Sequence, residues 1–250
     1  MKKKKRISYF IYWIVRSLVW LFYPKVRTEG TENIPDEPVI FVGNHTQMNG
    51  PIMAQLYFPG RRCIWCIGEM MEWKEVPAYA FKDFWSFKPK WTHWFYRILS
   101  FLITPLSVLI FNNADTIPVY HDGRLKDTFR KSVDALEEGS SLVIFPEQNV
   151  RYNHIIYDFQ EGFVDVARLY HRRTGREAAF VPVYLAPALK KIIFGKPVRY
   201  DASAPPKNER DRISSYLKNE ITEMAESLPR HRVVPYRNIP KKDYPWNREE

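Results

Sequence analysis

Asn44 and His45 are the first residues whose types and position could do chemistry, because they directly follow the apolar run VIFVG (39–43). Such a run predicts a buried strand, and ligands of open α/β sheets bind beyond the carboxyl ends of the strands. Pro51 suits the first position of a following helix. The positive end of that helix favours a neutral imidazole, which could act as a general base. A histidine after a strand is more often structural, so this motif needs support from others.

A second polar turn follows the apolar run SLVIF (141–145) and reads PEQNVR (146–151). Proline ends a strand ladder, so Glu147 and Arg151 form a charged pair at the carboxyl edge of another strand. Glu147 also has a plainer interpretation, as a structural carboxylate that pairs with a nearby Arg and fixes the loop. Two further segments place polar or proline residues in apolar runs: IPVYHDGR (117–124) and FVPVY (180–184).

Short apolar runs alternate with helical patterns from Pro38 onward, and these elements must position the motifs. Several strand candidates are continuously apolar, as in a sheet covered on both faces. The pattern predicts an α/β fold with a mainly parallel sheet flanked by helices. The strand candidates are 39–43, 62–67, 116–120, 141–145, 179–185 and 192–194, and the helix candidates are 125–136, 162–174 and 213–228.

The order and spacing of the four motifs resemble the glycerolipid acyltransferase superfamily, which contains the lysophosphatidic acid acyltransferases. Its motifs are Asn-His, four residues and Asp; a strand ending near an Arg; Phe-Pro-Glu-Gly-Thr-Arg; and Val-Pro-Val or similar. The resemblance covers roughly residues 30 to 200, and four motifs in order are far more specific than one. It implies the α/β fold of that superfamily and a 1-acyl-glycerol-3-phosphate acyltransferase-like O-acyltransferase.

The resemblance also implies substrates and roles. Enzymes of this family transfer a fatty acyl group from acyl-CoA or acyl carrier protein to a hydroxyl, commonly on a lysophospholipid, with no metal or prosthetic group. His45 would be the general base on that hydroxyl. The implied substrate-binding residues are Asn44, Arg124, Glu147, Gln148, Asn149 and Arg151. The alternative is a catalytically impaired or non-catalytic lipid-binding relative with the same fold.

One departure from the family pattern concerns the partner of His45, because the expected Asp falls on Gly50. Removing the carboxylate from a histidine triad in another enzyme class costs about four orders of magnitude in rate. Asn49 and Glu69 are the candidates for a replacement, and both count as predicted catalytic residues. A rise in turnover for Gly50→Asp, or its loss for Glu69→Gln, would test these hypotheses.

Both family arginine positions are also displaced. Gln148, Asn149 and Val150 replace Gly-Thr-Arg, so that Arg151 comes one position late. The arginine of the second motif aligns with His121, and Arg124 lies three residues further on. We therefore expect either shifted loops or an acceptor whose head group is not the usual glycerol phosphate.

The 250 residues carry a net charge of +10, with 45% hydrophobic and 16% aromatic residues, which excludes a disordered chain. Five basic residues (2–6) precede the apolar and aromatic run 7–23. A helix over that run would be roughly 25 Å long, short of the roughly 30 Å bilayer core, and Arg16 near its middle would be costly there. We predict a helix lying in the cytoplasmic leaflet of the cell membrane, with the lysines on anionic lipid. A single span, or a basic tail before a buried helix, remains open.

A second apolar patch supports a membrane partner. Aromatic and basic residues alternate over 85–94, and 98–111 is apolar but interrupted by Pro105. Fourteen residues are too few to span, so this segment is predicted to be a buried helix pair or a re-entrant or interfacial segment. No motif supports nucleic-acid binding, which the basic charge alone would allow.

The predicted organisation is a membrane-associated helix over 1–28, an acyltransferase-like domain over 29–235 and a C-terminal tail over 236–250. Cys63 and Cys66 form a Cys-x-x-Cys within an apolar strand, with no second pair and no nearby histidine. We therefore expect no metal site.

Overall fold

The computed structural model describes residues 2–120 and 122–249, with side chains from residue 7 onward. The chain forms two compact units. The apolar unit comprises the described residues up to Tyr23 together with Trp65–Thr128, and the sheet unit comprises Pro24–Ile64 together with the described residues from Phe129 onward.

The sheet unit is built on parallel strands, which confirms the predicted α/β fold. Strands β8, β2, β5 and β3 run parallel to one another, in that order. Strands β9 and β10 pair antiparallel with β8, and β1 pairs parallel with β9. The order β1-β9-β8-β2-β5-β3 places the two motif-bearing strands, β2 and β5, side by side. Their bounds are β1 Arg27–Glu29, β2 Ile40–Gly43, β3 Arg62–Ile67, β5 Ser141–Ile144, β8 Ala179–Ala186, β9 Lys191–Phe194 and β10 Val198–Arg199.

Continuously apolar strands explain the core of this unit. Every residue of β2 and β8 is buried, as expected when helices cover both faces of a sheet. Around β2, the rings of Phe41, Phe58 and Phe194 pack edge-on or tilted with centroids 5.2–5.6 Å apart. This packing holds β2 rigidly, and with it the residues that follow the strand.

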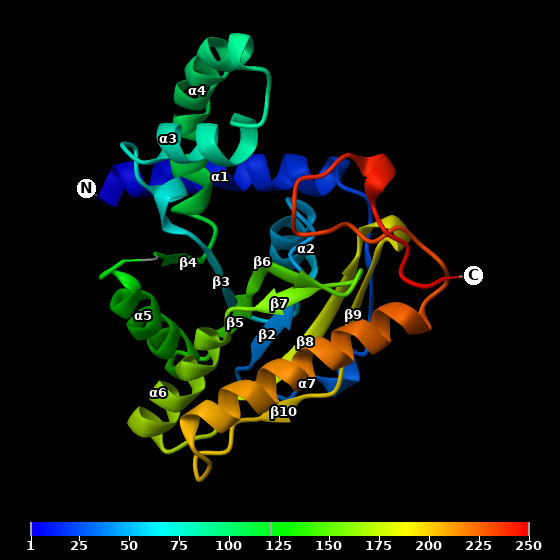
Figure 1. Cartoon of the computed structure of the whole chain (residues 1–250). Coiled ribbons are helices and arrows are strands. Elements are labelled where there is room, and N and C mark those ends of the chain that lie inside the picture. Colours follow the sequence, from blue (N-terminus) through cyan, green and yellow to red (C-terminus); the bar gives the residue numbers. More distant parts are fainter. Residues whose placement is uncertain (1, 121, 250) are drawn as a thin grey trace. The chain divides into compact units, whose positions relative to one another are not determined.

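Helices α2 (Asn49–Tyr57), α6 (Asp165–Thr174) and α7 (Pro206–Ser227) belong to the sheet unit. Helix α7 runs along β8 in Figure 1 and presents a buried stripe at helical spacing: Ile213, Leu217, Ile221 and Ala225. Helix α5 (Leu125–Glu137) begins in the apolar unit and ends in the sheet unit. The short 3₁₀ helices are η1 Thr31–Asn33, η2 Gly68–Met71, η4 Lys90–Thr92, η5 Glu161–Val164, η6 Pro187–Leu189 and η7 Lys241–Asp243.

The apolar unit contains α1 (Lys2–Phe22), α3 (Val76–Ala80), the π-helical turn η3 (Phe81–Trp85), α4 (His93–Phe111) and β4 (Thr116–Val119). Its small core consists of Met70, Val76 and Ala80, against which partly buried side chains of η3 and α4 pack. Helix α1 packs against α4, and Ser8 Oγ donates a hydrogen bond to Asn113 Oδ1 at 3.3 Å.

Helix α4 differs from the expectation of an interrupted fourteen-residue segment. It is one helix of 19 residues that continues through Pro105. Before the proline, Ser100 and Thr104 also donate from their side chains to the carbonyls of Tyr96 and Ser100, at 2.7 and 2.9 Å. The helical stretch Lys90–Phe111 is long and apolar enough to cross a membrane by length and composition, whereas Ile7–Phe22 is shorter. The predicted segment 98–111 is therefore only part of a longer helix, and the prediction that it is too short to span was wrong about its length.

Two parts of the sheet unit were not predicted. The turn after β5 forms an antiparallel hairpin of β6 (Glu147–Tyr152) and β7 (Tyr157–Phe159). Beyond α7, residues 229–247, called the C-terminal strap below, fold back and form an isolated bridge between Arg232 and Trp246. The predicted domain boundaries at 28 and 235 stay a prediction.

Candidate active site

Asn44 fixes the end of strand β2. Its Nδ2 donates to the carbonyl of Leu185 at 3.0 Å, and the N–H of Leu185 donates to its Oδ1 at 2.7 Å. The side chain is 2% exposed, so both ends of the amide bind the backbone of β8. Asn44 therefore aligns two strand ends and sets the direction in which His45 leaves the sheet. Its predicted part in substrate binding stays a prediction.

The His45 ring lies between two aromatic side chains. It packs edge-on against Phe145, with centroids 5.3 Å apart, and against Tyr236, at 5.5 Å. Nδ1 is buried and has no hydrogen-bonding partner among the described residues, while part of the side chain remains accessible. Burial lowers the pKa of His45 to about 4, opposed by the nearby backbone of Gln47. A neutral imidazole is thus favoured, chiefly by desolvation rather than by the helix end invoked from sequence.

The loop after His45 takes an unusual path. Thr46 and Gln47 have φ angles of 47° and 56°, two successive left-handed residues that are neither glycine nor asparagine. This path folds Gly50 back onto the carbonyl of His45, so that a Cβ at Gly50 would lie 2.1 Å from that oxygen. Glycine is required there by close backbone approach. A carboxylate could occupy position 50 only after the backbone of the loop had moved.

The two residues predicted to replace the missing carboxylate lie in different units. Asn49 begins α2, and its Nδ2 donates to the carbonyl of Thr46 at 3.2 Å, so its amide helps to hold the loop closed. Glu69 lies on η2 of the apolar unit, where its Oε2 is buried with no hydrogen bond from the described part of the chain. Their catalytic roles stay predictions.

Glu147 joins the His45 loop to the β6–β7 hairpin. Its Oε1 accepts a hydrogen bond from the backbone N–H of His45 at 2.7 Å, and its Oε2 accepts one from Tyr157 at 2.9 Å. The side chain is only 5% exposed. Burial raises the pKa of Glu147 to about 7. The two N–H groups oppose this shift, because their hydrogen bonds stabilise the ionised form. The carboxylate fixes the loop, as in the structural interpretation, but its partners are these backbone N–H groups and not the predicted arginine, Arg151 or another, within the described structure. The contacts show how the third motif positions the first.

The other residues of the third motif are more exposed. Gln148 donates through Nε2 to the carbonyl of Phe159 at 3.0 Å, which helps to close the hairpin. Asn149 and Arg151 are exposed on β6, and Arg151 forms no ion pair with any described residue. Arg151 is therefore the predicted cation that can receive an anionic group without giving up a partner.

Arg124, in the apolar unit, is already neutralised. Its guanidinium forms ion pairs with Asp122 at 2.8 Å and Glu75 at 3.2 Å, and it stacks 3.6 Å above the ring of Tyr120. An anionic substrate would have to displace these carboxylates. His121, which aligns with the family arginine, lies outside the described residues.

The C-terminal strap reaches the His45 loop, which the sequence did not reveal. The Nε2 of Gln47 donates to the carbonyl of Arg237 at 2.9 Å, and the hydroxyl of Tyr244 donates to its Oε1 at 3.2 Å. The ring of Tyr236 contacts both His45 and Tyr157. The aromatic residues of the strap were the only sequence signal for a packed segment. Because they show no helical or strand periodicity, nothing in the sequence indicated that they lie beside His45.

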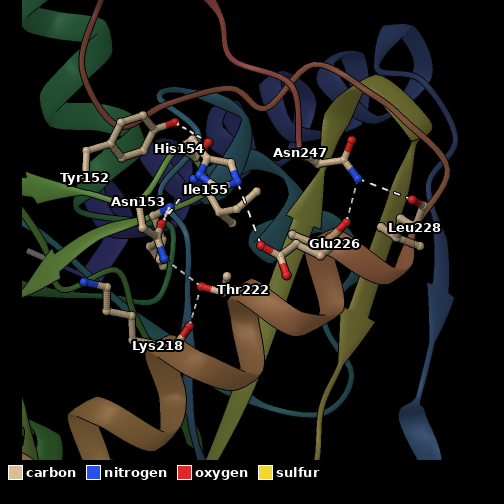
Figure 2. Close-up of polar contacts among 11 residues, drawn as sticks. Tyr152, Asn153, His154, Ile155, Lys218, Thr222, Glu226, Leu228 and Asn247 are labelled. Atoms are coloured by element: carbon tan, nitrogen blue, oxygen red, sulfur yellow. Dashed lines mark hydrogen bonds and ion pairs between the residues drawn. The ribbon is translucent and has the colours of Figure 1, made fainter. Parts of the chain in front are cut away.

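Helix α7 anchors both the hairpin and the strap (Figure 2). On the hairpin side, Asn153 donates to Thr222 Oγ1 at 2.9 Å, and His154 lies 3.9 Å from the carboxylate of Glu226. On the strap side, the buried Asn247 donates to the carbonyls of Ala225 and Leu228 at 2.8 and 3.3 Å. One rigid helix thus fixes two segments that meet at His45.

A neutral histidine beyond a central strand of a mainly parallel sheet defines a site that can accept a proton from a hydroxyl. Comparison with known proteins assigns the class. A model of the Acyltransferase family matches residues 25–186, about two thirds of the sequence, and the chain belongs to this family. We conclude that it is an acyltransferase.

Among solved structures, the fold is similar to that of the 1-acyl-sn-glycerophosphate (LPA) acyltransferase PlsC from Thermotoga maritima. The two share 16% sequence identity, with a TM-score of 0.52, over 92% of this chain and 86% of that one. At this identity the likeness concerns the fold. No curated protein sequence matches the chain.

Proposed function

We propose that this acyltransferase moves a fatty acyl group from an acyl thioester, acyl-CoA or acyl carrier protein, to a hydroxyl of a lysophospholipid-like acceptor. The observation that carries the proposal is the neutral His45 at the end of β2 in a member of the Acyltransferase family. The similar fold of PlsC, whose name specifies an LPA acyltransferase, favours a lipid acceptor.

In the proposed reaction, His45 accepts the proton of the acceptor hydroxyl as the oxygen attacks the thioester carbonyl. The C–S bond then breaks, and the leaving thiolate takes up the proton held by the imidazole. Nδ1 is buried, so the accessible edge of the ring must do this work. Ester and free thiol are the products, and no other reactant is needed.

We propose Arg151 for contact with an anionic group on either substrate, since it is exposed and unpaired within the described structure. Gln148 and Asn149 shape the same hairpin, and we keep them as predicted contacts. Arg124 is the weaker candidate because Asp122 and Glu75 already neutralise it. Changing Arg151 to Ala should raise KM for the anionic substrate with little change in kcat.

Association with the cytoplasmic face of a membrane is part of the proposal. Helices α1 and α4 expose many large apolar side chains. Exposure of so many apolar side chains to water is unfavourable, and such patches mark sites that contact a membrane or another protein. Among the most exposed are Trp13, Trp20 and Phe22 on α1 and Trp94, Phe101 and Leu102 on α4. Aromatic side chains favour the headgroup region of a bilayer, and the basic residues 2–6 would favour anionic lipid.

One observation favours the alternative of a non-catalytic lipid-binding relative. Nδ1 of His45 has no carboxylate within its part of the described structure to orient it, and Gly50 leaves no room for one. The experiment that separates the two functions measures thiol release from acyl-CoA and from acyl carrier protein over a panel of lysophospholipids. Release that requires both an acceptor and His45 supports the enzyme; acceptor binding without release supports the alternative.

A further inference from the structure

We propose that the C-terminal strap is a working part of the acyl-transfer site and that Tyr236 is a positioning residue, which holds the plane of the His45 imidazole. The inference rests on the acyltransferase function proposed above. In a chain with glycine at position 50, the strap would be the element that orients the base. The strap lies outside residues 25–186, the part of the chain that the family model matches.

The first support is the packing around the ring. Tyr236 meets His45 at an interplanar angle of 74°, and Phe145 meets it at 67°, so two edge-on contacts restrict rotation of the imidazole. Tyr236 in turn packs edge-on against Tyr157, at 72° and 6.2 Å. Tyr157 donates its N–H to Glu147, whose other oxygen binds the backbone of His45. Base, hairpin and strap therefore form one closed set of contacts.

The second support is that the strap also fixes the left-handed loop. Arg237 and Tyr244 bind the two ends of the Gln47 side-chain amide. Gln47 has φ of 56°, a conformation that costs energy for a residue other than glycine and needs neighbours to hold it. The strap supplies two such neighbours, Arg237 and Tyr244, in the residues that follow Tyr236.

The third support is that the strap is itself anchored rather than lying loosely on the surface. Buried Asn247 binds the end of α7 (Figure 2), and the buried His231 pairs with the hydroxyl of Tyr184 on β8 at 2.8 Å. Arg230 and Arg232 stack on Trp246 at 4.1 and 4.0 Å, which joins the two ends of the strap. An anchored aromatic can impose an orientation on the ring that it touches.

A histidine that lacks a carboxylate on Nδ1 needs another means of holding its reactive nitrogen toward the substrate. Orientation of a catalytic group within about an ångström accounts for large factors in rate. Of the groups against His45, Phe145 is apolar and Glu147 binds the backbone of His45. The Gln47 backbone faces the imidazole, and Tyr236 contacts the ring from the strap. Tyr236 also limits water around the ring, so its removal should hydrate the imidazole.

The test compares Tyr236→Ala with Tyr236→Phe, which keeps the ring, and with Lys242→Ala as a matched control on an exposed part of the strap. We expect Tyr236→Ala to lower kcat at least tenfold with KM within about twofold, and to move the acid limb of the pH–rate profile upward. Tyr236→Phe should restore most of kcat, and Lys242→Ala should resemble the wild type. Circular dichroism checks folding; should Tyr236→Ala unfold, Tyr236→Leu replaces it.

A second readout needs no activity. Titration of the His45 ring followed by NMR, with the signal assigned by its loss in His45→Asn, should show a higher pKa in Tyr236→Ala and Tyr236→Leu but not in Tyr236→Phe. An unchanged ring pKa together with unchanged kcat in the folded variants overturns the inference. If His45→Ala keeps full acyl transfer, the proposed function fails instead, and the NMR titration still decides whether Tyr236 controls the ring.

Discussion

At the scale of single residues, the site around His45 is built on buried polar groups that bind backbone rather than one another. Asn44 and Glu147 use their side chains to align strand ends and loops. Gly50 stands where the family pattern has Asp. The backbone of the loop passes so close to this position that an aspartate side chain would collide with the His45 carbonyl. Three predictions belong at this scale.

The first prediction concerns Gly50. Because a Cβ there would lie 2.1 Å from the His45 carbonyl oxygen, Gly50→Asp should lower turnover instead of raising it. Gly50→Ala should already destabilise the fold by about 1–3 kcal/mol, as overpacking against backbone does. Thermal unfolding and thiol release measure both effects. Gly162→Ala, where nothing lies within 4 Å of the added Cβ, is the matched control; a gain of activity in Gly50→Asp would contradict this account.

The second prediction concerns Glu147. Glu147→Gln retains one acceptor but turns an NH₂ toward a backbone N–H, which should cost about 1–3 kcal/mol of unfolding free energy. In the wild type the pKa of Glu147 is raised to about 7, so its ionisation removes stability as pH rises from about 4.5 to 7. The deficit of the variant should therefore be larger near pH 5 than near pH 8. Glu37→Gln, at an exposed ion pair with Arg199, should show neither effect.

The third prediction is the pH dependence of the reaction. With the pKa of His45 lowered to about 4 by burial, the neutral base persists well below the usual value of 6.5. The acid limb of kcat/KM that belongs to His45 should lie nearer 4 than 6.5. Samples returned to neutral pH must regain full activity, which separates titration from unfolding. A reversible limb at about 6.5 would count against a buried base.

At the scale of elements, the predictable parts are those with strong apolar patterns. The strands β2, β3, β5 and β8 follow from their apolar runs, and α7 follows from its spacing after two prolines. The β6–β7 hairpin and the strap could not be predicted in this way, because their polar or aperiodic residues are held by contacts with distant segments. The length of helix α4 was underestimated since Pro105 was taken as a break, although the helix continues through it.

The exposed face of α4 carries the prediction at this scale. Phe101 and Leu102 are 67% and 69% exposed in the described structure. If they enter lipid, Phe101→Ser with Leu102→Ser should weaken binding to vesicles at least tenfold, since each apolar side chain contributes about 1.5–3 kcal/mol when fully transferred. Sedimentation with phosphatidylglycerol-containing vesicles measures this binding. Val150→Ser, at an apolar residue 65% exposed on β6, is the control, and equal binding by all three proteins would refute the lipid contact.

The whole molecule is a member of the Acyltransferase family in which glycine replaces the aspartate expected near His45. The four motifs were sufficient to predict the fold, and they place His45 and Glu147 just beyond buried strands. The functional roles of the two residues stay predictions. The motifs could not reveal that Glu147 accepts a hydrogen bond from the backbone N–H of Tyr157, which lies on the hairpin. Nor could they reveal that Arg124 is neutralised, because its partner Glu75 lies outside the motifs. Part of the +10 charge lies in the basic run 2–6 at the start of α1, and the arginines that stack on Trp246 also contribute to it.

The central claim is that His45 acts as the base for acyl transfer without a carboxylate partner. A single-turnover measurement tests it directly: excess enzyme is mixed with labelled acyl-CoA or acyl carrier protein and a lysophospholipid, and labelled ester is quantified over time. We predict ester formation by the wild type and by the control Gly162→Ala, and a loss of at least about a hundredfold in rate for folded His45→Ala. Equal rates of ester formation by the wild type and His45→Ala would contradict the claim.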